Sequence, residues 1–236
     1  MSNSSLVDVK VMAHSSNYTQ GRKGKKIKKI TIHHMAGKLT AKQCGNVFQK
    51  KGRNASSNYG IGSDAKIGLY VDEANRAWTS SNADNDYEAV TIEVANSQIG
   101  GQWKVSSKSL KLLIKLCVDI CKRNGIKKLE KGKTLTWHSM FAKTTCPGPY
   151  LLSKFDYICK KVNAELEKAE KKNTVGKTKI LKKDCTLYSK SNLSGTKYTY
   201  KKNTTVKILK NISSTVDYVE VKATGRKAYI KNKYYK

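Results

Sequence analysis

The chain has 236 residues, enough for one full hydrophobic core and a smaller appendage. It carries 47 Lys and Arg against 17 Asp and Glu, and its net charge of +30 favours polyanionic partners such as nucleic acid, wall polymers or anionic membrane surfaces. No apolar run approaches the ~20 residues of a membrane span, and the first residues lack the apolar stretch of a secretory signal. We therefore expect no membrane span and a protein made in a cytoplasm.

Residues 28–34 (KKITIHH) alternate and are rich in β-branched side chains, which predicts a strand that ends in two histidines. Residues 40–52 begin with a capping Thr and end at Gly, the pattern of a short helix. Two further strands are expected at 57–64 and 66–72, before a polar loop. Residues 89–96 (AVTIEVAN) then predict a buried strand, and its one acid, Glu93, needs an explanation among apolar neighbours.

Residues 106–125 form a strongly amphipathic pattern that begins with capping serines and ends at Asn-Gly, which predicts a helix. Residues 133–140 predict a strand ending near His138, and Pro149 opens another helix that runs to about residue 172. Strands that alternate with helices are typical of an α/β fold. We expect a mixed central β-sheet flanked by helices.

The C-terminal part has a different character. Residues 171–236 hold 18 basic and 3 acidic residues and seven of the 13 tyrosines, without Trp or Phe. Short alternating segments split by Asn, Ser and Gly predict a small all-β barrel, whose tyrosines would stack on rings or sugars while lysines meet negative charge. We expect a catalytic domain at residues 1–164, a linker at 165–178 and the barrel at 179–236.

Histidine and cysteine are scarce, with 4 and 6 copies in the chain. The cysteines lack CxxC spacing, so reduced buried thiols are expected, but Cys146 stands apart because it lies eight residues after His138 and directly before Pro147. A catalytic zinc requires three His, Cys or carboxylate ligands and an open position. His33 or His34, His138 and Cys146 would supply them if they met at one edge of the sheet.

Four segments, ITIHHMAG, SSNYGIGSD, AVTIEVAN and WHSMFAKTTCPGPYL, occur in this order within about residues 27–160. Together they resemble the zinc-dependent N-acetylmuramoyl-L-alanine amidases, a family that includes phage lysozymes of the amidase type and peptidoglycan recognition proteins. The resemblance implies hydrolysis of the amide between N-acetylmuramic acid and L-alanine in peptidoglycan.

The resemblance also implies roles for single residues. It makes His33, His138 and Cys146 the zinc ligands and His34 a neighbour at the substrate. Glu93 corresponds to the general base, and Tyr59 to the active-site tyrosine of the family.

Two further positions follow from the resemblance. Many phage amidases have a lysine two residues before the cysteine; this chain has Thr144 there, as recognition proteins do, with Lys143 one position earlier. Thr144 would then stabilise the oxyanion, with Lys143 as the alternative donor. Trp78 lies in a loop expected to contact the substrate.

The C-terminal part resembles bacterial Src-homology-3-like wall-binding modules in size, strand rhythm and position. These resemblances imply a phage endolysin that acts on a Gram-positive wall after release from the host cytoplasm, with anionic wall polymers as further partners. The alternatives are an autolysin of the same activity, a non-catalytic peptidoglycan receptor and a nucleic-acid-binding protein; under the enzyme interpretation no specific nucleic acid is bound.

Overall fold

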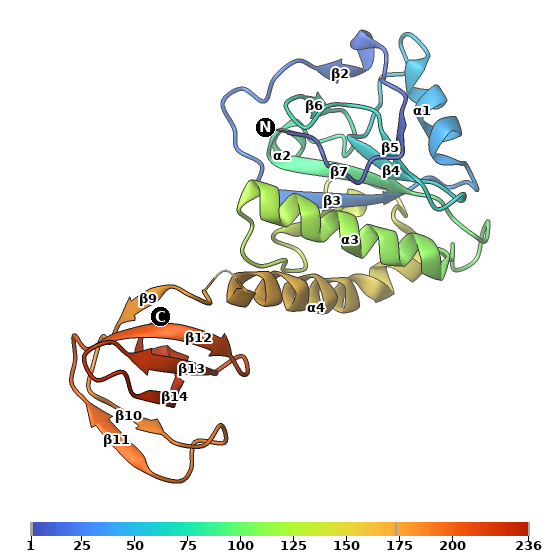
Figure 1. Cartoon of the computed structure of the whole chain (residues 1–236). Helices are drawn as coiled ribbons and strands as arrows, with labels where there is room; N and C mark the ends of the chain where they lie inside the picture. The colour runs from blue at the N-terminus through green and yellow to red at the C-terminus, as the bar shows by residue number, and fades with distance from the viewer. Residues whose placement is uncertain (1, 173, 236) are drawn as a thin grey trace. The chain divides into compact units, whose positions relative to one another are not determined.

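The computed structural model describes residues 2–172 and 174–235. The chain divides into two compact units, Met1–Leu166 and Glu167–Lys236 (Figure 1). In the first unit the helices and the chain's central strands are α1 (Ala41–Gln49), α2 (Ala83–Glu88), α3 (Ser107–Asn124), the first part of α4 (Gly148–Lys172), β3 (Lys29–His34), β4 (Tyr59–Ile61), β5 (Ile67–Leu69), β7 (Ala89–Val94) and β8 (Leu135–Trp137). Within the described ranges, no helix is long and apolar enough to cross a bilayer.

The central sheet has six strands in the order β1-β5-β4-β7-β3-β8, where β1 is Val9–Lys10. All neighbouring pairs are parallel except β4 and β5, which are antiparallel. The predicted mixed sheet flanked by helices is thus confirmed. The long helices were predicted from their hydrophobic period and capping residues, and the long strands from their β-branched and apolar side chains. Thr40, for example, forms a capping box with Gln43 at the start of α1.

The two faces of the central sheet are covered differently. Ile30, Ile32, Val90 and Ile92 form one core with the apolar stripes of α3 and α4, and both helices are seen along that face in Figure 1. The opposite face carries a smaller cluster that includes Cys44 and Phe48 of α1. All six cysteines are buried and unpaired, as expected for reduced thiols.

The segment expected to be a polar loop after residue 80 contains a short helix, α2. Asn82 caps it by accepting a hydrogen bond from the backbone N–H of Asn85 at 2.9 Å. At its other end the buried Arg22 donates through Nη1 to the carbonyl oxygens of Asp86, Tyr87 and Ala89 at 2.9–3.0 Å. A six-residue helix is too short to show a clear hydrophobic period, and its end is bound by Arg22, which lies 64–67 residues away in sequence. The local pattern therefore could not predict this helix.

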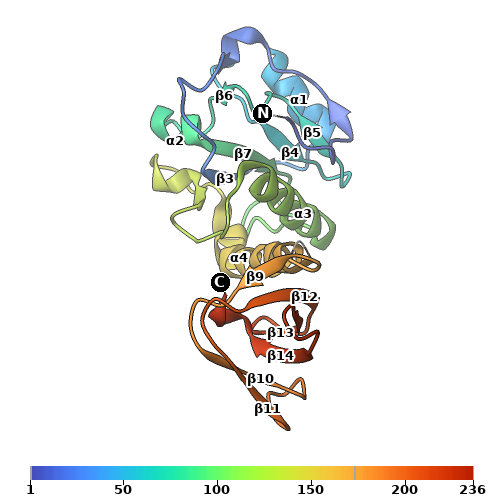
Figure 2. The same cartoon turned by 60° about the vertical axis from the view of Figure 1, so that its left-hand side comes forward.

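The second unit contains an all-β sheet, as predicted (Figure 2). Its strands are β9 (Thr178–Ile180), β10 (Cys185–Tyr188), β11 (Lys197–Tyr200), β12 (Thr205–Asn211), β13 (Val216–Val221) and β14 (Lys227–Lys231). They pair antiparallel in the order β11-β10-β14-β13-β12-β9 around a core of alternating Val, Leu and Ile side chains. Of the predicted linker 165–178, residues up to Lys172 continue α4, because the run of Glu, Lys and Ala has high helix propensity.

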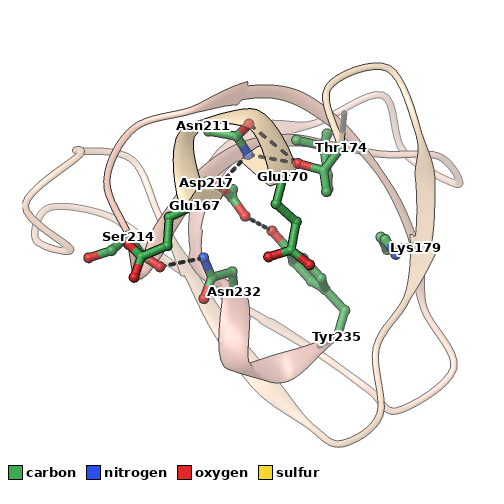
Figure 3. Close-up of a pocket in the computed structure, with 10 residues that line it drawn as sticks. Glu167, Glu170, Thr174, Lys179, Asn211, Ser214, Asp217, Asn232 and Tyr235 are labelled. Carbon is green, nitrogen blue, oxygen red and sulfur yellow. Dashed lines mark hydrogen bonds between the residues drawn. The ribbon is translucent and has the colours of Figure 1, made fainter. Parts of the chain in front are cut away.

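A pocket of about 560 Å³ lies within the second unit, lined by Glu167, Glu170 and Asp217 among other residues (Figure 3). Asp217 accepts hydrogen bonds from Asn211 at 2.7 Å and from the hydroxyl of Tyr235. Both oxygens of this carboxylate therefore have hydrogen-bond partners inside the unit, as a structural group does.

A buried ion pair joins the loop after β5 to the end of α3. The carboxylate of Glu73, which is fully buried, binds Arg123 through two hydrogen bonds of 2.9 and 2.6 Å and also accepts from the hydroxyl of Tyr59 at 2.7 Å. Burial by itself would lower the pKa of Arg123, but the hydrogen bonds to Glu73 and Asp119 and the charge of Glu73 together outweigh it, so the pKa is raised. Removing one partner of such a pair is strongly destabilising, because the other charge stays buried without a counter-charge.

We predict that Glu73→Ala lowers the free energy of unfolding of the first unit by about 3–5 kcal/mol. All three tryptophans, Trp78, Trp103 and Trp137, lie in this unit, so tryptophan fluorescence in a urea titration follows its unfolding selectively. Glu130→Ala is the matched control. Among the described residues Glu130 forms ion pairs with the exposed Lys128 and Lys133, so its loss should leave the midpoint nearly unchanged. Equal midpoints for the two variants would contradict this account.

Candidate metal centre

Three neighbouring parallel strands carry polar residues to the same edge of the central sheet. His33 on β3 lies directly opposite Glu93 on β7 in the register, so the two side chains share a face. His138 follows β8, which pairs with the other side of β3. Because parallel strands end at a common edge, residues 33, 93 and 138 converge there although they are far apart in sequence.

The three expected ligands come together at this edge. One ligand atom from each of His33, His138 and Cys146 lies within 4.8 Å of the others. His33 Nδ1 and Cys146 Sγ are 3.7 Å apart, close to the roughly 3.6 Å that tetrahedral zinc with ordinary Zn–N and Zn–S bonds would require. The imidazole rings of His33 and His138 are 4.7 Å apart between centroids. Two nitrogens and one sulfur in this arrangement fit a zinc ion and leave a position for water.

The ionisation of the three groups suits metal binding. Burial, and after it the nearby His138, lowers the pKa of His33 well below its usual value, and burial also lowers the pKa of His138. Both imidazoles are therefore neutral and have a lone pair to offer. Desolvation and the neighbouring Glu93 raise the pKa of the Cys146 thiol to about 12. A bound cation would displace the thiol proton, as metals do at cysteine ligands.

Unsatisfied buried atoms point into the same space. Nε2 of His138 and Oε2 of Glu93 are buried without a hydrogen-bond partner among the described residues. Such orphaned groups are rare, because each costs about 1–3 kcal/mol of desolvation. A metal ion with its water would satisfy atoms that the polypeptide leaves without partners, so the donor set fits a zinc centre.

Glu93 lines the same pocket of about 350 Å³ as the three ligand residues. Desolvation raises the pKa of Glu93 to about 8, and the charge of Arg53 offsets only part of that shift. A carboxyl group with this pKa can hold or release a proton near neutral pH, as general acid–base catalysis requires.

The loop that carries Cys146 is held by its own hydrogen bonds. The backbone N–H of Cys146 donates to Oγ1 of Thr144 at 3.2 Å, and its carbonyl accepts from the N–H of Ser139 at 3.0 Å. Thr144 lines the pocket, whereas the exposed Lys143 is absent from the lining. Because the Thr144 hydroxyl is used as an acceptor, its proton remains available for a ligand in the pocket.

His34 and Trp78 also line the pocket, on its walls. His34 alternates to the other side of β3 from His33, and its ring packs edge-on against Trp103 with centroids 5.1 Å apart. It therefore stays outside the three-ligand group. Trp78 donates through Nε1 to Thr19 Oγ1 at 2.8 Å, which fixes the indole in place.

The structure does not bring Tyr59 to this pocket. Tyr59 pairs with Ile92 across β4 and β7, so it faces away from Glu93 because side chains alternate along a strand. It is fully buried, and its hydroxyl donates to Glu73 and accepts from the backbone N–H of Ser4 at 2.8 Å. The expected active-site tyrosine is here a core residue. The sequence predicted the strand that carries Tyr59, but it did not predict on which face of the sheet the ring lies.

Three residues at the pocket were missed by the sequence reasoning, namely Arg53, Trp103 and Arg76. The first two line the 350 Å³ pocket, and Arg76 lines a neighbouring pocket of similar volume that shares Trp78 and His138 with it. The Arg76 guanidinium stacks 4.7 Å from the ring centroid of Tyr87, while its Nε has no partner among the described residues. These residues lie in loops or on a two-residue strand, where sequence carries no periodic signal.

A family model described as N-acetylmuramoyl-L-alanine amidase matches residues 23–149, more than half of the chain. The matched region contains His33, Glu93, His138 and Cys146. No curated protein sequence matches the chain.

Solved structures with the same fold include that of PlyL, 17% identical with a TM-score of 0.54, which covers 65% of this chain and 94% of that one. A mutant endolysin from Bacillus subtilis is 16% identical with a TM-score of 0.53, covering 66% and 99%. The catalytic domain of XlyA is 14% identical with a TM-score of 0.52, also covering 66% and 99%. The structural similarity shows a shared fold. The family model, which matches more than half of the chain, shows that this chain belongs to the N-acetylmuramoyl-L-alanine amidase family.

Proposed function

We propose that this chain is a zinc-dependent hydrolase that cleaves the amide bond between N-acetylmuramic acid and L-alanine in peptidoglycan. The observation that carries the proposal is the convergence of His33, His138 and Cys146 beside the orphaned carboxylate oxygen of Glu93. Zinc held by these three residues would supply Lewis acidity to the scissile carbonyl and to water.

The chain's own residues would handle the proton. Glu93 Oε2 would accept a proton from the attacking water and pass it to the leaving amine of L-alanine. Burial raises the pKa of Glu93 to about 8. A cation bound by the three ligand residues would oppose this effect and favour the ionised form of Glu93. The Thr144 hydroxyl would donate a hydrogen bond to the oxyanion that develops on the carbonyl oxygen.

Substrate positioning would fall to the walls of the pocket. Trp78 and His34 line it, and each is held by a contact that limits its motion, the first by Thr19 and the second by Trp103. Rigid walls of this kind keep the scissile bond close to the reacting groups. Tyr59 has no role in this scheme, because its hydroxyl is committed to Glu73 on the other face of the sheet.

The biological setting is also part of the proposal. Residues 1–164 would be the catalytic domain, 165–178 a connection and 179–236 a Src-homology-3-like module that binds the wall of a Gram-positive bacterium. The charge of +30 suits a wall rich in anionic polymers. We infer a phage endolysin that acts on the wall after release from the host cytoplasm, with an autolysin of the same activity as the alternative.

We predict that Cys146→Ser removes both zinc and amidase activity. Serine is a poor ligand for zinc beside two imidazoles, so zinc measured by atomic absorption should fall from about one per chain to near zero. Release of new L-alanine amino termini from purified peptidoglycan should fall with it. Zinc retained without any cleavage by the wild type would instead favour a non-catalytic peptidoglycan receptor.

The adjacent histidines provide a matched pair for the same experiment. His33→Ala should lose zinc, whereas His34→Ala should keep it, because only His33 shares the ligand group. Equal zinc loss in the two variants would contradict the assignment of His33 as the ligand.

We predict that Glu93→Gln keeps zinc and loses activity by about 10²–10⁴-fold, the usual contribution of a general base. Glutamine preserves the shape of the side chain but accepts no proton at neutral pH. Zinc content and the rate of L-alanine release are measured together, and a zinc-loaded Glu93→Gln protein with wild-type activity would remove Glu93 from the mechanism.

A further inference from the structure

One row of side chains crosses five strands of the second unit's sheet. The register places Lys197 of β11 opposite Tyr188 of β10, Tyr188 opposite Tyr229 of β14, Tyr229 opposite Tyr218 of β13, and Tyr218 opposite Lys210 of β12. Directly opposed residues share one face of a sheet. The result is a lysine–tyrosine row, Lys197-Tyr188-Tyr229-Tyr218-Lys210, which spans roughly 19 Å at the ordinary strand spacing.

The tyrosines of this row face away from the core of the unit. Their chain neighbours Leu187, Val219 and Ile230 are fully buried in that core, whereas the three row tyrosines are half-buried and lie outside it. Tyr198, Tyr200 and Tyr234, by contrast, pack against the core. The row is therefore an aromatic surface that lies outside the core of this unit.

The tyrosine hydroxyls of the row also have hydrogen-bonding capacity that the described residues do not use. Tyr218 and Tyr229 stack with ring centroids 4.7 Å apart, but no described residue hydrogen-bonds to the hydroxyls of the row. Tyr59, Tyr70 and Tyr235, which are buried, all have hydrogen-bonded hydroxyls. Half-buried rings whose hydroxyls have no partner among the described residues favour a ligand that packs on flat faces and also exchanges hydrogen bonds, as a sugar ring does.

The charges indicate what kind of polymer fits. The two lysines stand at the ends of the row, with three uncharged rings between them, and Glu220 lies next to the row between Lys207 and Lys227. A nucleic-acid strand carries a charge about every 3.4 Å in a duplex, so several of its phosphates would meet uncharged rings or the Glu220 carboxylate. A glycan whose anionic groups are separated by neutral sugar rings matches this pattern better.

We propose that the lysine–tyrosine row is the binding surface for an anionic wall glycan, a polymer of sugar rings with spaced phosphate groups. The tyrosines stack on its rings and hydrogen-bond its hydroxyls, while Lys197 and Lys210 pair with phosphates on either side. The identity of the polymer rests on the proposed function, and the binding surface itself is tested without any cleavage.

The test uses the full-length chain carrying Cys146→Ser, so that the walls stay intact, and measures its co-sedimentation with purified Gram-positive walls. Lys197→Glu with Lys210→Glu should weaken binding about tenfold or more at low salt. The matched control, Lys190→Glu with Lys202→Glu, changes net charge equally at exposed lysines outside the row and should weaken binding less than about threefold. Equal losses in the two double variants would overturn the proposal, because only total charge would then matter.

The rings are tested separately. Tyr218→Ala with Tyr229→Ala should weaken wall binding at least about fivefold, whereas Tyr218→Phe with Tyr229→Phe, which keeps the rings, should retain most of it. Circular dichroism confirms folding, and the Phe pair supports the proposal independently if the Ala pair is unstable. Equally weak binding by a folded Phe pair would remove stacking from the account.

Two probes test the nature of the polymer. Walls stripped of phosphate polymers by acid should bind the protein at least about fivefold more weakly than untreated walls; equal binding to both would overturn the proposal. Tighter binding to a single-stranded oligonucleotide than to the wall polymer at one ionic strength would also overturn it. Row variants with Cys146 restored should cleave a small soluble muropeptide as fast as the wild type. If the proposed enzyme activity is wrong, this cleavage is absent in the wild type too; if the proposed surface is wrong, only the predicted losses of wall binding are absent.

Discussion

The fixed parallel register of β8, β3 and β7 is the constraint on which the candidate metal centre depends. It sets His33 opposite Glu93 and brings His138 to the same edge. A slip of one residue would turn His33 toward the apolar face and present His34 in its place. The register is held because Ile30, Ile32, Val90 and Ile92 are all completely buried under α3 and α4, so a slip would expose the whole apolar set.

The face of the sheet that carries the centre is built differently from the apolar face. Thr31 and Thr136 share a hydrogen bond of 2.8 Å, and Thr79 donates to Thr91 at 2.8 Å, so buried hydroxyls beneath the pocket satisfy one another. Against this satisfied floor, the unpartnered atoms of His138 and Glu93 stand out. Because these floor hydroxyls already bond to one another, the unpartnered atoms that line the pocket keep their bonding capacity for a ligand.

The two units use charge in different ways. In the first unit the ionisable groups discussed above are buried, as in the Glu73–Arg123 pair and the carboxyl of Glu93, and the low dielectric strengthens each of their interactions. In the second unit the lysines are numerous and exposed, so each acts weakly and is screened by salt. One basic chain can therefore have both a precisely arranged buried site and a long-range attraction to a polyanion. The buried site relies on groups in a low dielectric, and the attraction relies on lysines exposed to water.

The sequence by itself determined the long elements, the all-β character of the C-terminal part and the candidate ligands His138 and Cys146, because periodic burial, capping residues and rare residue types are local signals. With the family resemblance it also indicated His33 and Glu93. Only the tertiary structure decided that Tyr59 faces the core and that α2 is a helix closed by Arg22. It also decided that Arg53 and Trp103 line the pocket of the candidate metal centre and that Arg76 lines the neighbouring pocket. The lysine–tyrosine row likewise exists only after five strands pair in register. These features depend on contacts between residues far apart in the chain, and neither spacing nor composition encodes which face of a sheet a side chain will share with distant partners.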